Sequence, residues 1–185
     1  TEMAGIRTYT EEGYKSVNQA LRENQVNGKM RNFLEVTNSG LKKMKGHEGL
    51  VIRFDCLPPR LAKEHKWGST VTYPSYTSTS SKPDFEWNQE CKDNWVTRRA
   101  LICTKGQGVD VSPVSATPNE DEVLFLPKSK FQVLEKYPIY GMNNPELHVM
   151  VALNENGKPS TSPDLCEKEI KEYLANGPST RNSAS

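Results

Sequence analysis

The spacing of apolar residues changes near Gly49, and this change constrains the fold more than any other feature of the 185-residue chain. Before it, apolar residues recur every three or four positions, as they do in amphipathic helices. After it, short runs rich in β-branched and aromatic residues alternate with Gly, Pro and polar turns, which is typical of strands. Helices followed by closely spaced strands predict a single α+β domain with mainly antiparallel pairing.

Two helices are predicted in the first third of the chain. Thr10 is suited to cap the first helix. Its apolar stripe consists of Tyr14, Val17 and Leu21. The second helix covers residues 28–44, and an Asn-Ser-Gly sequence at 38–40 favours a break within it. Its inward-facing residues are expected to be Met30, Phe33, Leu34, Leu41 and Met44.

The remainder of the apolar segments have the composition of strands. They cover residues 50–57, 69–80, 95–111, 122–127, 130–140 and 146–153. Gly106 and Gly108 predict a turn inside the third of these segments. The fourth and fifth are expected to pair as neighbours in a meander, and the last is expected to complete the strand region.

The end of the chain is polar and differs from the rest. A flexible stretch opens it, and a short helix follows, with Asp164 and Glu167 in capping-box positions. The final residues are rich in Ser and Asn and are expected to be disordered. We therefore predict a folded domain over residues 1–153 and a polar C-terminal extension over residues 154–185, with a short helix and a disordered tail.

Charge and hydropathy limit the kinds of partner. The net charge of +1 gives no indication of binding to nucleic acid or to an anionic membrane. No apolar stretch approaches the roughly 20 residues that a membrane-spanning helix needs, so we expect no membrane insertion. A monomer is expected.

Cysteine and histidine spacing indicates no metal site. The four cysteines lie far apart without a CxxC pair, which argues against zinc. Cys56 and Cys103 lie in apolar, strand-like runs and are expected to be buried free thiols. The three histidines have no ligand spacing, and we expect them to be surface or loop residues. They are His47, His65 and His148.

Arg53 lies in the middle of an apolar segment, between Ile52 and Phe54. A partly buried guanidinium group needs an acceptor, and its planar fork fits a phosphate or a carboxylate. Two interpretations remain open. Arg53 either pairs inside the protein with Asp55 or a glutamate, or it binds an anionic group of a ligand.

Ser78, Thr79 and Ser80 end a run of β-forming residues. Alternation along a strand puts Ser78 and Ser80 on one face, where their hydroxyls can donate or accept hydrogen bonds. Ser and Thr runs are also common in loops, so this segment indicates a site only together with others. Phe85 follows in a polar loop, where its ring either anchors the loop or stacks on a planar ligand.

Glu120, Asp121 and Glu122 stand directly before an apolar run. If they are extended, Glu120 and Glu122 share a face with Cα atoms roughly 6.6 Å apart, and Asp121 points away. Two neighbouring carboxylates can divide a task because each shifts the pKa of the other. One alternative is a solvated loop. Another is a glycosidase pair near the inverting separation, which the scarcity of aromatic platforms disfavours.

Taken in order, Arg53, the Ser-Thr-Ser sequence and the Glu-x-Glu sequence resemble the R-S-E, or cholera-toxin-like, class of mono-ADP-ribosyltransferases. This class includes bacterial toxins and effectors and vertebrate arginine-specific ecto-enzymes. The segments GYKSVNQALR, WGSTVTYPSYTSTS and GQGVDVSPVSATPNEDEVLFLPKSKFQV are similar to the early helix, the approach to Ser-Thr-Ser and the Glu-x-Glu region of these domains. The resemblance covers roughly residues 9–134.

The resemblance implies an ADP-ribosyltransferase fold, with N-terminal helices packed on a mainly antiparallel core of two β-sheets, and NAD as a substrate. Arg53 would hold the dinucleotide in its compact shape, and the backbone of Phe54 would meet the nicotinamide amide. Thr79 and Ser80 would support the nicotinamide pocket, together with Ser78. Phe85 is a candidate to stack on the nicotinamide ring.

The resemblance also assigns catalytic roles. Glu122 matches the catalytic glutamate, Ser78 the serine that positions it, and Glu120 the upstream residue that engages the acceptor. Cleavage of the nicotinamide–ribose bond develops oxocarbenium character, as glycoside cleavage does. A fixed carboxylate near that positive charge stabilises the transition state more than the ground state. This chemistry requires no metal.

The implied protein is a bacterial toxin or effector, secreted by the bacterium and acting in the host cytosol on a host protein such as a small GTPase, actin or ubiquitin. Glu-x-Glu implies an arginine acceptor. Two departures from the family pattern bear on the pocket and on this acceptor. Phe54 replaces a residue that is often Gly, and residues 112–119 lack the aromatic side chain that often helps to recognise the acceptor. The alternatives are another acceptor, such as a threonine of ubiquitin, and an inactive binding module with the same fold.

Overall fold

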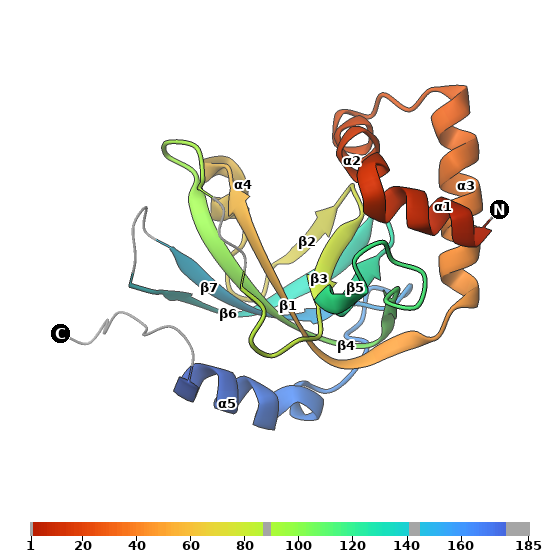
Figure 1. Ribbon diagram of the computed structural model, residues 1–185. Helices are drawn as coiled ribbons and strands as arrows, with labels where there is room; N and C mark the ends of the chain where they lie inside the picture. The colour runs from red at the N-terminus through yellow and green to blue at the C-terminus, as the bar shows by residue number, and fades with distance from the viewer. Residues whose placement is uncertain (1, 87–89, 141–144, 177–185) are drawn as a thin grey trace.

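The computed structural model describes residues 2–86, 90–140 and 145–176 of the chain (Figure 1). The helices are α1 (Glu2–Thr8), α2 (Tyr14–Glu23), α3 (Gly28–Lys43), α4 (Pro59–Glu64) and α5 (Glu167–Asn176). The strands are β1 (Gly46–Leu57), β2 (Thr70–Tyr73), β3 (Thr77–Ser80), β4 (Val96–Asp110), β5 (Glu122–Phe125), β6 (Ser129–Pro138) and β7 (Glu146–Ala152). Within these residues no helix is both long and apolar enough to cross a membrane.

The predicted α+β architecture is confirmed, but its division into two sheets is wrong. All the strands belong to one hydrogen-bonded sheet in the order β1-β3-β5-β4-β7-β6-β2, with an additional pairing of β1 with β4. Only the pairing of β4 with β7 is parallel. The sheet is continuous because β4 is long enough to pair with β1 and β7 along its first part and with β5 at its end.

Two strand predictions are corrected. β4 runs through Gly106 and Gly108 without the predicted turn. A Cβ atom on Gly108 would lie 2.6 Å from the side chain of Val123, so this glycine allows β5 to approach β4 closely. The segments 122–127 and 130–140 do not pair as a meander, because β5 pairs with β3 and β4 while β6 pairs with β2 and β7.

The N-terminal helices cover one end of the sheet (Figure 1). The first helix begins at Glu2 and continues into α2 through a π-helical turn, so Thr10 is not its cap. The Thr10 hydroxyl instead donates to the Arg7 carbonyl and accepts a hydrogen bond from the backbone of Ala116. The apolar faces of these helices pack against strand residues in one cluster, whose fully buried members are Ile6, Tyr9, Val17, Leu34, Leu41, Tyr76, Val109, Val111 and Leu124.

α3 is unbroken, which contradicts the predicted interruption at 38–40. Gly40 lies where α1 crosses α3, and a Cβ atom there would approach the side chains of Glu2 and Ile6 to 3.0 and 3.1 Å. The glycine therefore permits close helix packing instead of ending the helix. The inward-facing residues predicted for this helix all belong to, or pack against, the same cluster.

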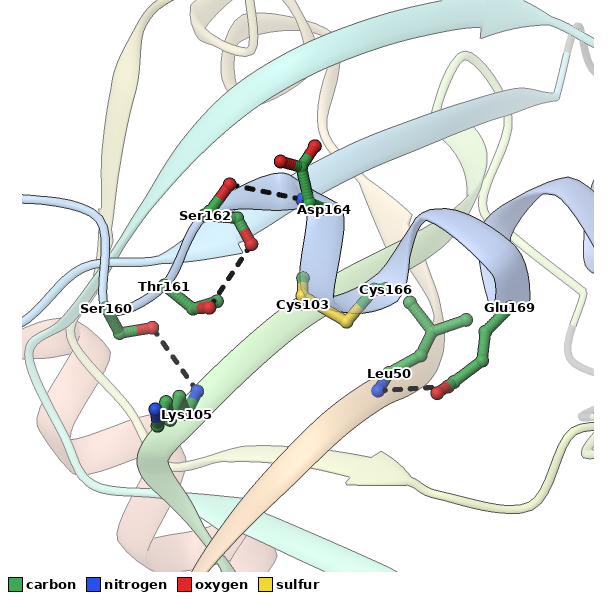
Figure 2. The surroundings of a disulfide bond; sticks show 9 residues. All are labelled: Leu50, Cys103, Lys105, Ser160, Thr161, Ser162, Asp164, Cys166 and Glu169. Carbon is green, nitrogen blue, oxygen red and sulfur yellow. Dashed lines mark hydrogen bonds between the residues drawn. A yellow bond between two sulfur atoms is a disulfide. The ribbon is translucent and has the colours of Figure 1, made fainter.

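The four cysteines form two disulfides, so the prediction of free buried thiols is wrong. Cys56 near the end of β1 pairs with Cys91 in the loop before β4. Cys103 in β4 pairs with Cys166, in the 3₁₀ turn that leads into α5 (Figure 2). No local pattern indicates this pairing, because the partners are 35 and 63 residues apart.

α5 is held against the sheet by more than its disulfide. Ile170, Tyr173 and Leu174 pack on the cluster that includes Ile52 and Phe54. A carboxylate oxygen of Glu169 accepts a hydrogen bond from the Leu50 backbone (Figure 2). The predicted capping box is replaced by a turn in which the Ser162 hydroxyl accepts a hydrogen bond from the Asp164 backbone. The predicted disordered tail lies outside the described residues, and the division at residue 153 stays a prediction.

Two of the histidines are buried, which corrects their assignment to the surface. His65 and His148 are both 0% exposed, and their rings stack with centroids 5.2 Å apart. Nε2 of His65 bonds the Tyr73 hydroxyl at 2.7 Å. Burial, together with the positive charge of Arg98, lowers the pKa of His65 to about 4. His47, the third histidine, is partly exposed.

The buried His65 makes the fold sensitive to acid. The unfolded chain binds a proton at His65 near the ordinary pKa of about 6.5, whereas the folded protein does so only near about 4, so stability falls as pH drops through this window. We expect His65 to contribute a loss of about 2 kcal/mol in the free energy of unfolding between pH 8 and pH 5. Urea unfolding at both pH values measures it.

His65→Gln keeps an acceptor for the Tyr73 hydroxyl but does not titrate, so its stability should depend less steeply on pH than that of the wild type. His47→Gln is the matched control and should keep the wild-type dependence. An unchanged pH dependence in His65→Gln would contradict the prediction.

Candidate functional site

The sheet brings the three predicted motifs onto neighbouring strands. β3 lies between β1 and β5, and Ser80 is opposite both Ile52 of β1 and Glu122 of β5. Arg53 and Ser78 therefore lie on neighbouring strands, and so do Ser78 and Glu122. Residues far apart in sequence thus converge at one place in the fold.

Glu122 is the first residue of β5, and its side chain is nearly buried. The hydroxyl of Ser78 donates to its Oε2 atom at 2.6 Å. Burial raises the pKa of the Glu122 carboxyl, the Ser78 hydrogen bond opposes this, and the charge of Glu120 raises it further. The Ser78 hydrogen bond therefore both fixes the orientation of the carboxylate and favours its ionised form.

Glu120 does not lie on the strand with Glu122, which corrects the predicted geometry. It ends a 3₁₀ turn, Pro118–Glu120, and Asp121 then takes the left-handed conformation with φ of 46°. Asp tolerates this conformation better than most residues. The Glu120 side chain is exposed, and the separation estimated from strand alternation does not apply. Since Glu120 raises the pKa of Glu122, the two carboxylates still interact.

Arg53 forms the internal ion pair with Asp55 that was one of its two interpretations, and its binding to a ligand stays a prediction. Its Nε donates to Oδ2 of Asp55 at 3.0 Å, and its Nη1 donates to the Ser78 carbonyl at 2.8 Å. Its side chain is nevertheless 25% exposed. Arg53 is therefore held in place by an internal ion pair while part of its guanidinium group remains accessible to an anion.

The other two residues of the Ser-Thr-Ser sequence hold β3 against β5. Thr79 is buried, and its hydroxyl donates to the Val123 carbonyl at 2.7 Å. The Ser80 hydroxyl donates to the Glu120 carbonyl at 2.6 Å and accepts from the Lys82 backbone. These bonds fix the turn that carries Glu120. A direct role for Thr79 and Ser80 in a nicotinamide pocket stays a prediction.

The structure places Phe85 against Phe54, with ring centroids 6.0 Å apart. Side chains alternate along β1, so Phe54 and Arg53 point to opposite sides of the strand. Phe85 also lines a groove of about 480 Å³ beside α5, together with Ile52, Arg99 and Tyr173 among others. The stacking of Phe85 on nicotinamide therefore stays a prediction, and the observed packing anchors its loop.

Sequence reasoning missed two residues near the site, Tyr9 and Arg98. Tyr9 of the N-terminal helices is buried, and burial and the charge of Glu122 raise the pKa of its hydroxyl, which accepts a hydrogen bond from Asn18. Asp55 and Arg98 bond each other beside Arg53. Asp55 was named in advance as a partner of Arg53, and this pairing is confirmed, whereas nothing local marked Arg98 or Tyr9.

The described residues contain no cluster of His, Cys, Asp or Glu side chains arranged to hold a metal ion. The groups that converge are instead a fixed carboxylate, a hydroxyl that orients it and a partly exposed guanidinium. This set can bind an anionic ligand and stabilise positive charge that develops beside Glu122.

Comparisons with known proteins identify relatives of this chain. The chain is 32% identical over 135 residues to Mav of Mycobacterium avium strain 104, a candidate NAD(+)–arginine ADP-ribosyltransferase, with 73% of this chain and 16% of that protein aligned. It is 28% identical over 129 residues to Tre1 of Serratia proteamaculans strain 568, an NAD(+)–protein-arginine ADP-ribosyltransferase, with 69% and 27% aligned. The chain thus spans less than a third of either relative.

Among solved structures, the ADP-ribosyltransferase Vis of Vibrio splendidus has the same fold. The TM-score is 0.69 at 19% identity, over 86% of this chain and 77% of Vis. The family described as ADP-ribosyltransferase exoenzyme matches residues 1–156, a range that includes every residue of the candidate site. With most of its length matched, this chain belongs to the ADP-ribosyltransferase exoenzyme family.

Proposed function

We propose that this chain is a mono-ADP-ribosyltransferase that moves ADP-ribose from NAD to an arginine side chain of a target protein and releases nicotinamide. One observation carries the proposal. The Glu122 carboxylate is held by the Ser78 hydroxyl at 2.6 Å, one strand away from a partly exposed Arg53. The arrangement provides an anion-binding group on β1 and a fixed carboxylate on β5, the two strands that flank β3.

The chemistry fits these groups. The bond between nicotinamide and ribose breaks, its electron pair leaves with nicotinamide, and the ribose gains oxocarbenium character. Glu122 would accept a hydrogen bond from the ribose 2′-hydroxyl and stabilise the developing positive charge. The acceptor nitrogen then forms the new bond to the ribose and loses a proton, which Glu120 would take. Arg53 would bind the diphosphate.

Arginine is the proposed acceptor. Mav and Tre1 are both described as acting on arginine, and Vis was solved in complex with agmatine, which carries the same guanidinium group. In this chain the exposed carboxylate of Glu120 can pair with such a group. This supports arginine even though residues 112–119 carry no aromatic side chain.

We further propose that the protein is a monomeric bacterial toxin or effector that is secreted and modifies a host protein in the host cytosol. A small GTPase, actin and ubiquitin are candidate acceptors. Two disulfides favour passage through an oxidising compartment, which secretion provides.

Labelled NAD incubated with the protein and a eukaryotic lysate tests the function. We expect a labelled band with the wild type and none with Glu122→Gln, and mass spectrometry should locate ADP-ribose on arginine. Label on threonine or another side chain would overturn the arginine acceptor but keep the transferase. No label and no release of nicotinamide would favour an inactive binding module with this fold.

Replacing Glu120 should separate the two halves of the reaction. Glu120→Gln is expected to lower transfer to the acceptor by about a hundredfold but to lower NAD hydrolysis much less, because water needs no carboxylate to hold it as a cationic acceptor does. Agmatine as acceptor and nicotinamide release as the hydrolytic readout measure both in one preparation.

Asp121→Asn is the matched control for Glu120→Gln. It removes the same charge from the neighbouring residue, and Asn tolerates the left-handed conformation found there. This variant should keep both activities. Equal loss of transfer and hydrolysis in Glu120→Gln would show that Glu120 does not handle the acceptor.

A further inference from the structure

A buried ion pair lies directly behind Arg53. Arg98 of β4 is 0% exposed and binds Asp55 with two parallel hydrogen bonds, Nε to Oδ1 at 2.8 Å and Nη2 to Oδ2 at 2.6 Å. The same Oδ2 atom accepts from Nε of Arg53 at 3.0 Å. One carboxylate therefore joins a fully buried guanidinium to the partly exposed one of the candidate site.

The hydrogen-bond network continues beyond Arg98, and each of its bonds has a defined donor and acceptor. Nη1 of Arg98 donates to the Tyr73 hydroxyl at 2.7 Å. In neutral His65 that hydroxyl donates a hydrogen bond to Nε2, also at 2.7 Å, because Nδ1 faces a carbonyl that can only accept. Nδ1 of His65 then carries a hydrogen and donates it to the Leu61 carbonyl at 2.7 Å. Every polar group of this network has a hydrogen-bond partner while His65 is neutral. Arg98 is therefore held rigidly from both sides.

The charges in this cluster do not cancel. Burial alone would raise the pKa of Asp55, but the charges of Arg98 and Arg53 hold it well below its usual range. Two guanidinium groups thus share one carboxylate, which leaves one positive charge. Arg98 cannot offer this charge to a ligand, because its side chain is completely buried. The excess charge is presented by Arg53, whose side chain is 25% exposed.

We propose that Arg98 is a positioning residue for dinucleotide binding, because it occupies Asp55 and thereby orients Arg53 and keeps its positive charge available to the diphosphate. The inference rests on the proposed function. In the described part of the chain no hydrogen bond uses Nη2 of Arg53, while its Nε and Nη1 are engaged by Asp55 and the Ser78 carbonyl. Among the described residues the network therefore leaves Nη2 of Arg53 available to a ligand.

Removing Arg98 would change Arg53 in two ways. Asp55 would lose the two bonds that fix its plane, so it could rotate to bind Arg53 with both oxygens. The ion pair would then be one to one, and the charge facing the ligand would be neutralised. Both changes weaken NAD binding and leave Glu122 and Ser78 as they are. The expected signature is a rise in KM for NAD with little change in kcat.

A double-mutant cycle tests whether Arg98 acts through Arg53. Nicotinamide release from NAD would be measured for the wild type, Arg98→Met, Arg53→Met and the double variant. We expect Arg98→Met to raise KM about tenfold. The double variant should have the KM of Arg53→Met alone, because Arg98 has no route to the ligand once Arg53 is gone. Independent effects that multiply in the double variant would overturn the inference.

Arg99→Met is the matched control. Arg99 is the next residue on β4, and its guanidinium lies over the Phe54 ring at 4.7 Å and bonds the Tyr173 hydroxyl at 3.1 Å. It takes no part in the Asp55 network, so its KM for NAD should match that of the wild type. An equal rise in KM for Arg99→Met and Arg98→Met would mean that any loss of a β4 arginine has this effect, and would overturn the inference.

Loss of folding is separated from loss of positioning by milder variants. If Arg98→Met lacks the circular dichroism spectrum of the wild type, Asp55→Asn and Arg98→Lys replace it in the cycle. Lysine keeps the buried charge but cannot form both parallel bonds, so KM should rise less than in Arg98→Met. Unchanged KM in folded Asp55→Asn and Arg98→Lys would overturn the inference.

The proposed function can fail separately from the inference. Wild-type protein that releases no nicotinamide in a Glu122-dependent manner would overturn the function, and the inference with it. Wild-type protein that is active, combined with independent effects of Arg98 and Arg53, would overturn the inference alone. Calorimetric titration with carba-NAD, which is not cleaved, should show the same non-additive pattern in Kd.

Discussion

Glu122→Gln is expected to lower both nicotinamide release and ADP-ribose transfer by about a thousandfold or more while leaving the fold intact. The amide has the same shape and can still accept a hydrogen bond from Ser78, but it carries no negative charge. The transition state would then lose the charge that stabilises the oxocarbenium-like ribose. Fluorescent NAD analogues or labelled NAD measure release, and thermal unfolding checks the fold.

Two companion measurements separate charge from position. Ser78→Ala leaves the carboxylate but removes its 2.6 Å hydrogen bond, so a smaller loss, of about tenfold, is expected. Burial raises the pKa of Glu122, and only the ionised form is active, so wild-type activity should fall as pH drops through that raised pKa. Glu122→Gln with activity near that of the wild type would remove Glu122 from the mechanism.

Reduction of the two disulfides is expected to destabilise the protein by about 4 kcal/mol for each bond, because they close chain segments of 35 and 63 residues. In a domain of this size each loss corresponds to a fall of roughly 10 °C in Tm. Calorimetry with and without a reducing agent measures the combined effect, and Cys103→Ala with Cys166→Ala isolates the bond that holds α5.

The two bonds should differ in their effect on activity. Cys56 follows Arg53 on β1 by three residues, and its partner Cys91 lies in the loop between β3 and β4, so this bond is close to the site. The bond from Cys103 to Cys166 fixes the start of α5 (Figure 2). Loss of the first should therefore reduce activity more than loss of the second.

An equal Tm in oxidised and reduced protein would contradict the predicted stabilisation.

The disulfides bear on the proposed site of action. A protein that folds in an oxidising compartment and acts in a reducing cytosol would work there without these bonds. The expected loss of stability is comparable with the whole stability of many domains of this size. Activity measured at 37 °C under reducing conditions therefore decides whether the reduced protein can act inside a cell.

The sequence by itself determined the class of the fold and the chemistry of the site. The change from helical to alternating periodicity near residue 49 is local, and local patterns report secondary structure directly. Arg53, Ser78 and Glu122 could be singled out because each is a polar residue placed in a β-forming segment. Their order along the chain carried the resemblance that the family match then confirmed.

Tertiary structure decided which distant residues meet. Pairing of Cys103 with Cys166, bonding of Arg98 to Asp55 and burial of His65 leave no periodic signal, because each depends on a contact across the sheet. The position of Glu120 also depends on tertiary structure. The Ser80 hydroxyl holds the Glu120 carbonyl in a turn that local strand propensity would not predict.

One physical cause separates what the sequence determined from what the tertiary structure decided. Periodicity arises from the repeat of the backbone, so the sequence reports which face of an element is buried. The partner on that face is chosen by strand order and by the long β4, which joins β1, β5 and β7. The sequence therefore singled out the candidate carboxylate Glu122 and the candidate arginine Arg53, and the sheet alone placed a second, buried arginine, Arg98, next to Asp55.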